Sequence, residues 1–328
     1  MKKAFEIILV IMILPLLSSC VSHISLGERA IVKAICVDYN NDEYLAKLVV
    51  FTCDADTDTK SVNERAQCYE GKGANIDTAI NVCEKKQNKK PFYAQNELLF
   101  ISENAASKIG DDIIEYFNRQ SIMGQDLAVL VTQNTDAFKN NENSAKIIND
   151  AQRIANDSTD TKGSKKLYEY STVNNAIFGY IPYVKLEKTG CMETGIILDE
   201  TIIENDNGAN LIKLLDNRIK NIKLQNENIT LKNININYEA KMVKNKPVLT
   251  IFVQGYIDEN TAKAEKINSL LNLEFEKIIE KTYDLGNDVF GFENRLRAIS
   301  SARCDELSEK NELYNNERVK IKSQLKSA

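Results

Sequence analysis

The N-terminus carries the only long apolar run of the chain, and this run determines the compartment in which the rest must fold. Lys2 and Lys3 precede the apolar segment Ile7–Leu17. Its length of about 11 residues is shorter than the ~20 that a membrane-spanning helix needs, and a short positive region before such a segment is typical of a secretory signal. The sequence therefore predicts that the remainder of the chain is exported.

Cys20 follows this segment directly, in the sequence Leu-Ser-Ser-Cys. Small residues before a cysteine at this place resemble a bacterial lipobox, in which the cysteine thiol receives diacylglycerol and becomes the mature N-terminus. We therefore predict a lipoprotein signal peptide over residues 1–20 and a lipidated Cys20, with acyl chains such as palmitate. Two or three chains, at ~0.8 kcal/mol per buried CH₂, would anchor the protein stably to a membrane. An ordinary signal peptide with a chance cysteine and an uncleaved anchor are the alternatives.

Composition narrows the classes of function that the exported part can have. The 328 residues are enough for two or three domains, and the net charge is -5 with no basic block interleaved with aromatics, which argues against nucleic-acid binding. The chain has no Trp and a single His, His23, which precedes the folded part. A Ser-His-Asp or Cys-His arrangement is therefore not expected, and no carboxylate pair is a favoured catalytic candidate. We predict a protein that is not an enzyme and needs no cofactor.

Six cysteines remain after Cys20: Cys36, Cys53, Cys68, Cys83, Cys191 and Cys304. An even number in an exported chain makes disulfides possible, but no CxxC spacing is present, so a zinc site is not expected. Cys83 follows Ile76, Ala79 and Ile80 at helical spacing, which indicates a core position. We expect most of these cysteines to be buried thiols and leave their disulfide state open.

Residues 21–155 are predicted to form an N-terminal α/β domain. A hairpin is expected at its start, from runs of Val, Ile and Leu around Asn40–Asp42. The elements expected in this domain alternate between strand and helix: strands 30–38, 43–52 and 66–70, helix 76–86, strand 97–102, helix 105–118, strand 127–132 and helix 144–154. Such alternation indicates a mixed sheet covered by helices.

Three polar stretches in this domain resemble ligand sites weakly. Asp54–Thr59 alternates Asp as in a calcium loop, but it lacks the glycine and the distant glutamate and is predicted to be a solvated loop. Gly71–Gly73 lacks the Walker pattern for phosphate binding and is predicted to be a turn from strand to helix. The run Lys85–Lys90 is rich in lysine and is predicted to be a solvated helix end, with contact to anionic lipid or an acidic partner as the alternative.

The rest of the chain is predicted to form two further units. Residues 156–208 read as a linker and a small β-rich middle domain, with strands 176–186 and 194–198 and a closing turn at Asn205–Gly208. Residues 209–328 read as a C-terminal α+β domain. Its expected elements are strands 234–238 and 248–256, a long amphipathic helix over 261–282, a buried corner at 288–292 and an edge strand over 319–325. The predicted fold class is α+β (mixed α/β) in three domains, each a mostly antiparallel or mixed sheet with packed helices, the middle one small.

Five stretches, in this order and after the lipobox, resemble the C subunit of spore germinant receptors, the Ger(x)C family of lipoproteins. They are Glu28–Val32, Ile35–Asp38, Gly71–Ala79, Tyr93–Ile101 and Asp288–Phe292. The family has an apolar strand ending in Gly-Ile-Asp, a Gly-Lys-Gly sequence before a helix, and a strand that begins with Tyr. The order and spacing of these stretches, more than any one of them, carry the resemblance.

The resemblance implies three mixed α/β domains without an enzymatic site. It also implies assembly with integral-membrane A- and B-type subunits in the inner membrane of a spore, where the complex would respond to germinants such as amino acids or sugars. Two other classes compete with this interpretation. A solute-binding lipoprotein of a transporter would need two large α/β lobes and a hinge, and a lipid-anchored hydrolase would need a catalytic carboxylate that the sequence does not single out.

Overall fold

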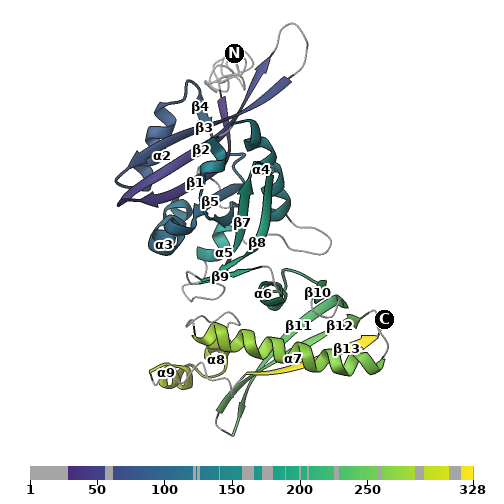
Figure 1. Ribbon diagram of the computed structural model, residues 1–328. Helices are drawn as coiled ribbons and strands as arrows, with labels where there is room; N and C mark the ends of the chain where they lie inside the picture. Colours follow the sequence, from purple (N-terminus) through teal and green to yellow (C-terminus); the bar gives the residue numbers. More distant parts are fainter. Residues whose placement is uncertain are drawn as a thin grey trace, which may run out of the picture.

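The structure is a computed structural model. It describes residues 29–55, 62–120, 123, 126–139, 141–156, 166–171, 180–188, 190–198, 201–204, 207–224, 229–244, 246–257, 261–284, 292–309 and 319–327. These residues form two units, one built on a nine-stranded sheet and the other on a four-stranded sheet. Figure 1 shows the larger unit above the smaller one, with helix α6 between them.

The large sheet is mixed. Its strand order is β3-β2-β1-β5-β6-β7-β8-β9, and β4 pairs with the start of β1. The strands are β1 Arg29–Asn40, β2 Glu43–Ala55, β3 Val62–Gly73, β4 Lys90–Phe92, β5 Leu98–Ser102, β6 Ala128–Thr132, β7 Tyr180–Glu187, β8 Gly190–Leu198 and β9 Thr201–Glu204. The central pairs β1-β5, β5-β6 and β6-β7 are parallel, whereas β1-β2-β3 and β7-β8-β9 are antiparallel meanders at the two edges.

The predicted hairpin at the start of the domain is confirmed. Strands β1 and β2 pair antiparallel across Asn41 and Asp42, whose φ angles are 52° and 59°. Positive φ at both central residues is typical of a type I′ turn, whose twist suits a two-residue hairpin, and Asn and Asp tolerate this conformation. The third strand is longer than expected, because β3 runs to Gly73 rather than ending at Glu70.

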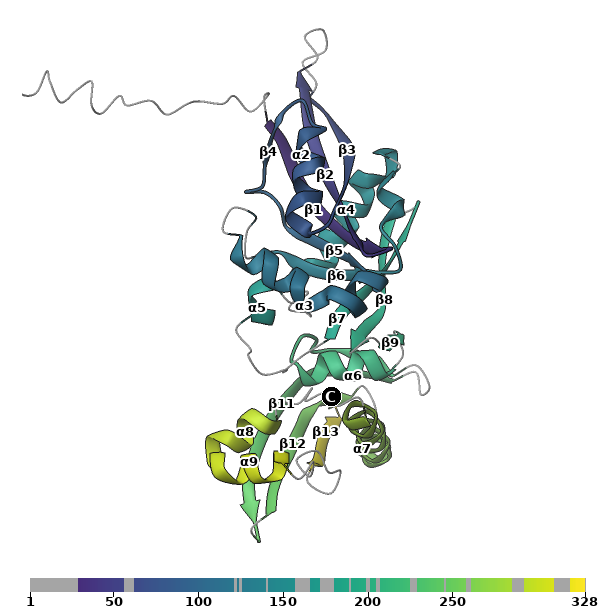
Figure 2. The same cartoon turned by 90° about the vertical axis from the view of Figure 1, so that its left-hand side faces the viewer.

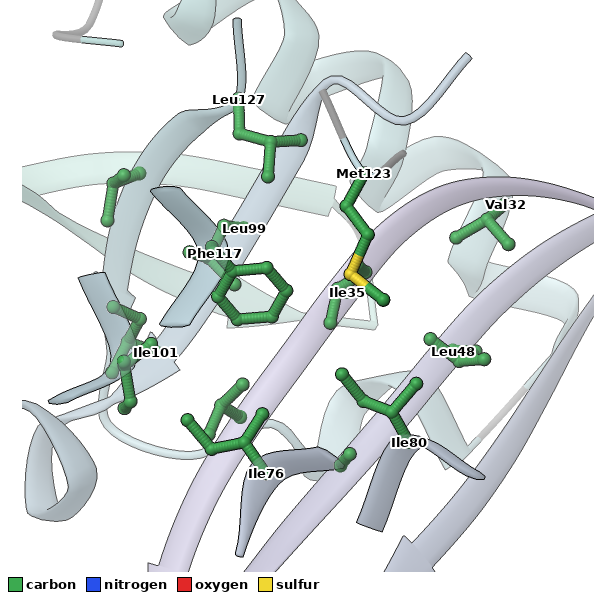
Figure 3. Close-up of a cluster of buried hydrophobic side chains, with 14 of the residues drawn as sticks. Val32, Ile35, Leu48, Ile76, Ile80, Leu99, Ile101, Phe117, Met123 and Leu127 are labelled. Carbon is green, nitrogen blue, oxygen red and sulfur yellow. The ribbon is translucent and has the colours of Figure 1, made fainter. Parts of the chain in front are cut away.

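Helices cover both faces of the large sheet (Figures 1 and 2). Helices α2 (Ile76–Lys85) and α3 (Glu103–Arg119) pack on one face, and α4 (Asn141–Ala155) with the 3₁₀ turn η2 (Asp136–Lys139) packs on the other. Figure 3 shows the first layer, where side chains of the two helices lie against buried residues of the strands: Ile76, Ile80 and Phe117 against Ile35, Leu48 and Leu99. The sheet is therefore buried on both sides, as its apolar strands require.

The two helix starts on this face are capped by side chains. Asn75 Oδ1 accepts a hydrogen bond from Thr78 N over 2.8 Å at the start of α2. Ser102 Oγ accepts one from Ala105 N over 3.1 Å at the start of α3. Each cap satisfies a backbone N–H that has no partner within the helix, which determines where the helix begins.

The smaller unit is a four-stranded sheet in the order β10-β11-β12-β13. Its strands are β10 Ile222–Leu224, β11 Ile229–Val243, β12 Lys246–Ile257 and β13 Val319–Ser327. The long helix α7 (Thr261–Asp284) packs on it through Ile267, Leu271 and Phe275, while α8 (Phe292–Ile299) and α9 (Ser301–Glu309) follow it. The predicted long helix and C-terminal edge strand are confirmed, and β13 pairs parallel with β12.

The two units share one apolar core. Helix α6 (Asn207–Leu215) buries Leu211 and Leu214 in a cluster that also contains Tyr180 and Ile196 of the large sheet and the inner residues of the small one. The predicted boundary at 208/209 therefore falls inside a helix, because Asn207 and Gly208, which were expected in the closing turn Asn205–Gly208, begin α6. A short helix, α5 (Leu167–Ser171), precedes β7.

The sequence predicts a separate middle domain, but the strands expected there belong to the large sheet. Strands β7, β8 and β9, which the sequence assigns to a separate middle domain, continue the large sheet because β7 pairs parallel with β6. The predicted boundary at 155/156 separates β6 from β7, although the two strands are neighbours in one sheet. A linker-like composition does not reveal with which strand the next segment of the chain will pair. The expected buried corner at 288–291 lies outside the described residues.

Candidate functional site

Cys20, the predicted lipidation residue, lies outside the described part of the chain. The first described residue is Arg29, which begins β1 and lies beside Lys90 of β4. Figures 1 and 2 both place β4 at the end of the large unit that is remote from the small sheet. Within the described residues, no helix is both long enough and apolar enough to cross a bilayer.

Several basic side chains belong to β1, β4 and the end of α2. They are Arg29, Lys33, Lys85, Lys86 and Lys90. Arg29 lies over the ring of Phe92 at 4.7 Å, Lys33 Nζ donates to Gln95 Oε1 over 3.0 Å, and Lys86 Nζ donates to the backbone oxygen of Glu70 over 2.6 Å. None of the five forms an ion pair within the described chain.

The Gly-Lys-Gly stretch is not the predicted turn but the end of strand β3. A Cβ on Gly71 would lie 2.2 Å from the oxygen of Ala79 and 2.8 Å from the nitrogen of Cys83. A Cβ on Gly73 would lie 2.7 Å from the nitrogen of Ala79. Both glycines are therefore required because the backbone of α2 passes directly over β3 at these positions. The sequence carries one signal for this role that the predicted turn does not use: glycines two residues apart on one strand share a face.

The aspartate of the second family-like stretch organises the next helix. Asp38, which is 7% exposed, accepts a hydrogen bond from Ser102 Oγ over 2.6 Å and one from Tyr39 N over 2.7 Å. Because Ser102 also caps α3, this carboxylate holds the cap in place at the carboxyl ends of the parallel strands β1 and β5. Asn104 adds hydrogen bonds to the oxygen atoms of Tyr39 and Asn40.

Tyr93 begins the fourth family-like stretch and connects it to α2. Its hydroxyl donates to Glu84 Oε1 over 2.5 Å, and burial together with this contact raises the pKa of Tyr93 far above its usual range. The second, third and fourth family-like stretches thus position helices α2 and α3 on the sheet.

A buried lysine lies on the opposite face. Lys47 of β2 is 1% exposed, and its ammonium donates to Thr135 Oγ1 over 2.7 Å and to Asp136 Oδ1 over 3.1 Å. Lys139 pairs with the same carboxylate over 2.8 Å, and the hydrogen bonds from Lys139 and Lys47 lower the pKa of Asp136. The ammonium ties the edge of the sheet to the loop after β6. Sequence reasoning did not find this site, because a single Lys in an apolar strand carries no motif.

Five cysteines in the described part carry thiols rather than disulfides: Cys36, Cys68, Cys83, Cys191 and Cys304. All but Cys68 are buried, in agreement with the expectation from their isolated spacing. Burial raises the pKa of Cys83 and of Cys191 to about 12, and that of Cys68 to about 11. Such thiols are protonated near neutral pH and are poor nucleophiles. The side chain of Cys53 lies outside the described residues.

Metal-binding side chains do not gather within the described ranges: no group of three or more His, Cys, Asp or Glu there is arranged to hold a metal ion. Most of the Asp54–Thr59 stretch, which resembles a calcium loop in its spacing alone, lies outside those ranges.

The end of α6 places polar groups at the junction of the two units. Asn217 has a φ of 55°, its N–H bonds to the oxygen of Leu214 over 2.9 Å, and Arg218 N bonds to the oxygen of Lys213 over 2.9 Å. This is a Schellman C-cap with Asn in the left-handed position. It stops the helix and turns Arg218 toward the large unit.

Arg218 then joins the two units through acidic side chains. Its guanidinium pairs with Glu169 of α5 and with Asp216 Oδ2 at 3.4 Å, while the Tyr180 hydroxyl of β7 donates to Asp216 Oδ2 over 2.9 Å. Arg218 and Asp216 are 15% and 11% exposed. Burial, with Asp216 nearby, raises the pKa of Tyr180 well above its usual range. The junction is therefore a partly buried polar network as well as an apolar core.

A second ion pair crosses the same junction. Lys213 of α6 pairs with Glu193 of β8, with side chains 10% and 24% exposed. On the other side of α6, the Tyr238 hydroxyl donates to the oxygen of Leu215, and Arg295 of α8 lies 4.2 Å over the ring of Tyr238. These contacts connect β8, α6, β11 and α8 in one chain of interactions.

Both the sequence and the fold are similar to those of known proteins. Residues 22–184 match the family model described as the spore germination protein N-terminal domain. The chain is also similar in structure to the crystal structure of the GerBC protein, with a TM-score of 0.51 and 12% identity over 89% of this chain and 96% of that chain. At this identity the similarity shows the fold. A search of curated protein sequences found no match.

The fold is therefore the mixed α/β architecture of GerBC, and its first half is a spore germination protein domain. The match over residues 22–184 confirms the resemblance to the germinant receptor C-subunit family that is seen in the sequence.

Proposed function

We propose that this chain is a non-catalytic, lipid-anchored subunit of a spore germinant receptor, acting in nutrient-triggered germination as a scaffold or signalling partner of integral-membrane subunits. The observation that carries the proposal is the spore germination protein domain over residues 22–184. The roles of Asp38, Gly71 and Tyr93 support a scaffold, because each positions a helix on the sheet through packing or hydrogen bonds.

The chemistry of the reactive side chains also supports a non-catalytic role. The ammonium of Lys47 is held by Thr135 and Asp136, and the thiols of Cys83 and Cys191 have pKa values raised to about 12 by burial. A thiol nucleophile is activated by a lowered pKa, whereas burial raises the pKa of both thiols.

The proposed anchor is the lipid on Cys20, which would hold the chain on the outer face of the spore inner membrane. Eight residues separate Cys20 from Arg29, so the two are at most about 30 Å apart. The large unit would then lie next to the bilayer, within reach of A- and B-type integral-membrane subunits.

A gene deletion tests the proposal. Spores that lack the chain should fail to germinate with the nutrient that the receptor recognises, and should still germinate when a chemical agent bypasses the receptors. The wild-type gene should restore the response, and the Cys20→Ala variant should not. Normal nutrient germination of the deleted spores, together with a defect in vegetative solute uptake, would contradict the proposal and favour a transporter lipoprotein.

A further inference from the structure

We propose that the open face of the small sheet docks an acidic segment of a partner protein. The inference goes beyond the proposed function and takes from it only the position of the lipid anchor. We call this face of strands β10 to β13 the basic face, and its charged side chains are Lys223, Lys232, Glu239, Lys241, Lys320, Lys322 and Lys326.

The other face of the same sheet is covered by helices. Leu249, Ile251 and Val253 of β12 are buried in the core that includes α7, and Figure 1 shows this helix lying across the strands. Asn268 Oδ1 of α7 also accepts a hydrogen bond from Leu325 N over 3.0 Å, so the helix holds the edge strand β13 in place. Because side chains alternate between the two faces of a strand, the residues between these point to the opposite face.

That opposite face is exposed to solvent. The side chains of Lys241 and Glu239 are 63% and 43% exposed, and Tyr256 of β12 is 46% exposed. All six lysines of the basic face are exposed as well. The large sheet differs, because it carries helices on both faces. The basic face is therefore a sheet surface that can receive another molecule.

The strand register brings its side chains into one patch. Tyr256 pairs with Lys232 on β11 and with Lys326 on β13. Phe252 of β12 pairs with Lys322, whose ammonium lies 5.7 Å from the centre of the ring. Neighbouring strands are about 4.8 Å apart, and residues on one face repeat every ~6.6 Å along a strand. Lysines on β11 and β13 therefore flank a central row that contains both aromatic rings.

The charge of the basic face is one-sided. Six lysines and one glutamate give it a net charge of +5, in a chain whose total is -5. The exposed charges of α7, on the other side of the sheet, have both signs: Glu265, Lys266, Glu276, Lys277 and Glu280. Mixed signs are usual for a solvated surface. The basic face is instead complementary to a partner that carries carboxylates.

The central row of the patch favours a protein as this partner. Protein interfaces combine an apolar, aromatic centre with a polar rim, and here Val248, Phe252 and Tyr256 lie between the lysines of β11 and β13. Single-stranded nucleic acid instead needs aromatic rings open to stacked bases, whereas Lys322 lies over the ring of Phe252.

The position of the small sheet disfavours the bilayer as the occupant. Both ribbon views place this sheet at the opposite end of the molecule from β4 (Figures 1 and 2). Strand β4 pairs with the start of β1, the end of the described chain that is nearest in sequence to Cys20. A lipid on Cys20 would therefore hold the large unit, rather than the basic face, against the membrane.

Peptide binding tests the inference on the chain from residue 21 onward, which contains every described residue and lacks Cys20. The probe is a fluorescein-labelled peptide of Glu-Glu-Leu repeats, which in extended form presents both residue types on each side because side chains alternate. A peptide of Gln-Gln-Leu repeats is its uncharged control. Fluorescence anisotropy measures the affinity for each peptide at low and at physiological salt.

Three variants locate the binding surface. The test variant neutralises the lysines that flank the two aromatic rings: Lys232→Gln, Lys322→Gln and Lys326→Gln. The control variant removes the same charge at exposed lysines of α2, β4 and α7: Lys85→Gln, Lys90→Gln and Lys266→Gln. A third variant, Tyr256→Ser, removes the central ring and leaves the charge unchanged. Circular dichroism should show all three folded.

We expect the Glu-Glu-Leu peptide to bind the wild-type chain, and to bind more weakly as salt rises because the attraction is screened. The test variant should bind it on the order of ten-fold more weakly, since each exposed ion pair contributes a few-fold. The control variant should bind it as the wild type does. Tyr256→Ser should weaken binding and leave the salt dependence unchanged.

No binding of the acidic peptide, equal binding of the uncharged peptide, or equal loss in the test and control variants would overturn the inference. Tighter binding to phosphatidylglycerol vesicles or to oligothymidylate, lost in the test variant, would also overturn it, in favour of a bilayer or a nucleic acid. The assay needs neither the lipid anchor nor membrane subunits, so its outcome is independent of the germination test of the proposed function.

Discussion

Lys47 Nζ donates a hydrogen bond of 2.7 Å to Thr135 Oγ1, so a buried cation on β2 is held by the loop that follows β6. The two residues are 88 positions apart in the sequence. A contact between such distant segments closes the side of the sheet that carries α4 and ties the antiparallel edge to the parallel centre.

Replacing Thr135 by Val should destabilise the protein by about 1–3 kcal/mol, because the buried ammonium loses an acceptor and gains none. Lys47→Met removes the charge and keeps the length of the side chain, so it should cost less than Thr135→Val or should stabilise the protein. Urea unfolding of the two variants measures the difference. If Lys47→Met were less stable than Thr135→Val, the ion pair of Lys47 with Asp136 would itself stabilise the fold. The expected cost of leaving a buried ammonium without an acceptor would then be the smaller effect.

The pKa of Asp136 is lowered by Lys139 and Lys47, which makes stability depend on pH. Because the pKa is lower in the folded than in the unfolded state, the carboxylate stabilises the fold above the usual aspartate pKa of about 4, and this contribution is lost as the pH falls through the folded value. Asp136→Asn should therefore flatten the stability profile below about pH 4. Unfolding midpoints from pH 2 to 7 check this, and parallel profiles for wild type and variant would disprove it.

Gly71→Ala should destabilise the protein by about 3 kcal/mol, because the new methyl group would meet the backbone of α2 and push the helix away from β3. Gly110→Ala, in helix α3, is the matched control, since no atom lies within 4 Å of its Cβ position. There alanine should stabilise by up to about 1 kcal/mol through helix propensity. Thermal unfolding distinguishes the two, and equal effects would mean that α2 does not pack closely on β3.

Arg218→Gln should destabilise the junction by about 2 kcal/mol, because Glu169 and Asp216 are left partly buried without their partner. The control is Lys277→Gln, which removes an exposed pair with Glu274 and should cost less than about 0.5 kcal/mol. Hydrogen exchange of α6 and β7 should rise in the first variant alone. Unchanged exchange there would show that the apolar core holds the units together without the polar network.

The sequence predicts the strands and helices of the first unit well, because their apolar periodicity and their caps are local. The helices predicted over 76–86 and 144–154, which the structure shows as α2 and α4, are examples. The sequence does not predict which strands pair when they are far apart in the chain. Strand β7, for example, pairs with β6 although a polar segment separates them. The sequence also fails to assign Gly71 to a strand, because a close approach between two elements is a property of their packing.

Polar contacts between residues far apart in the sequence are likewise not predictable from local patterns. Lys47 with Thr135, and Arg218 with Glu169, join residues 88 and 49 positions apart, and no local pattern predicts either pair. The left-handed Asn217 could have been found, since Asn after the last apolar residue of a helix is a known stop signal. Cys20 was predicted from sequence alone and stays a prediction, because it lies outside the described residues.

The most direct test of the proposed function is purification of the full-length tagged chain from detergent-solubilised inner membranes of spores, with mass spectrometry of what accompanies it. We predict two integral-membrane proteins of the germinant receptor A and B types in fixed proportion to the chain, with an acylated N-terminal Cys20. Recovery of the chain alone, or together with a transport permease and its ATPase, would contradict the proposal.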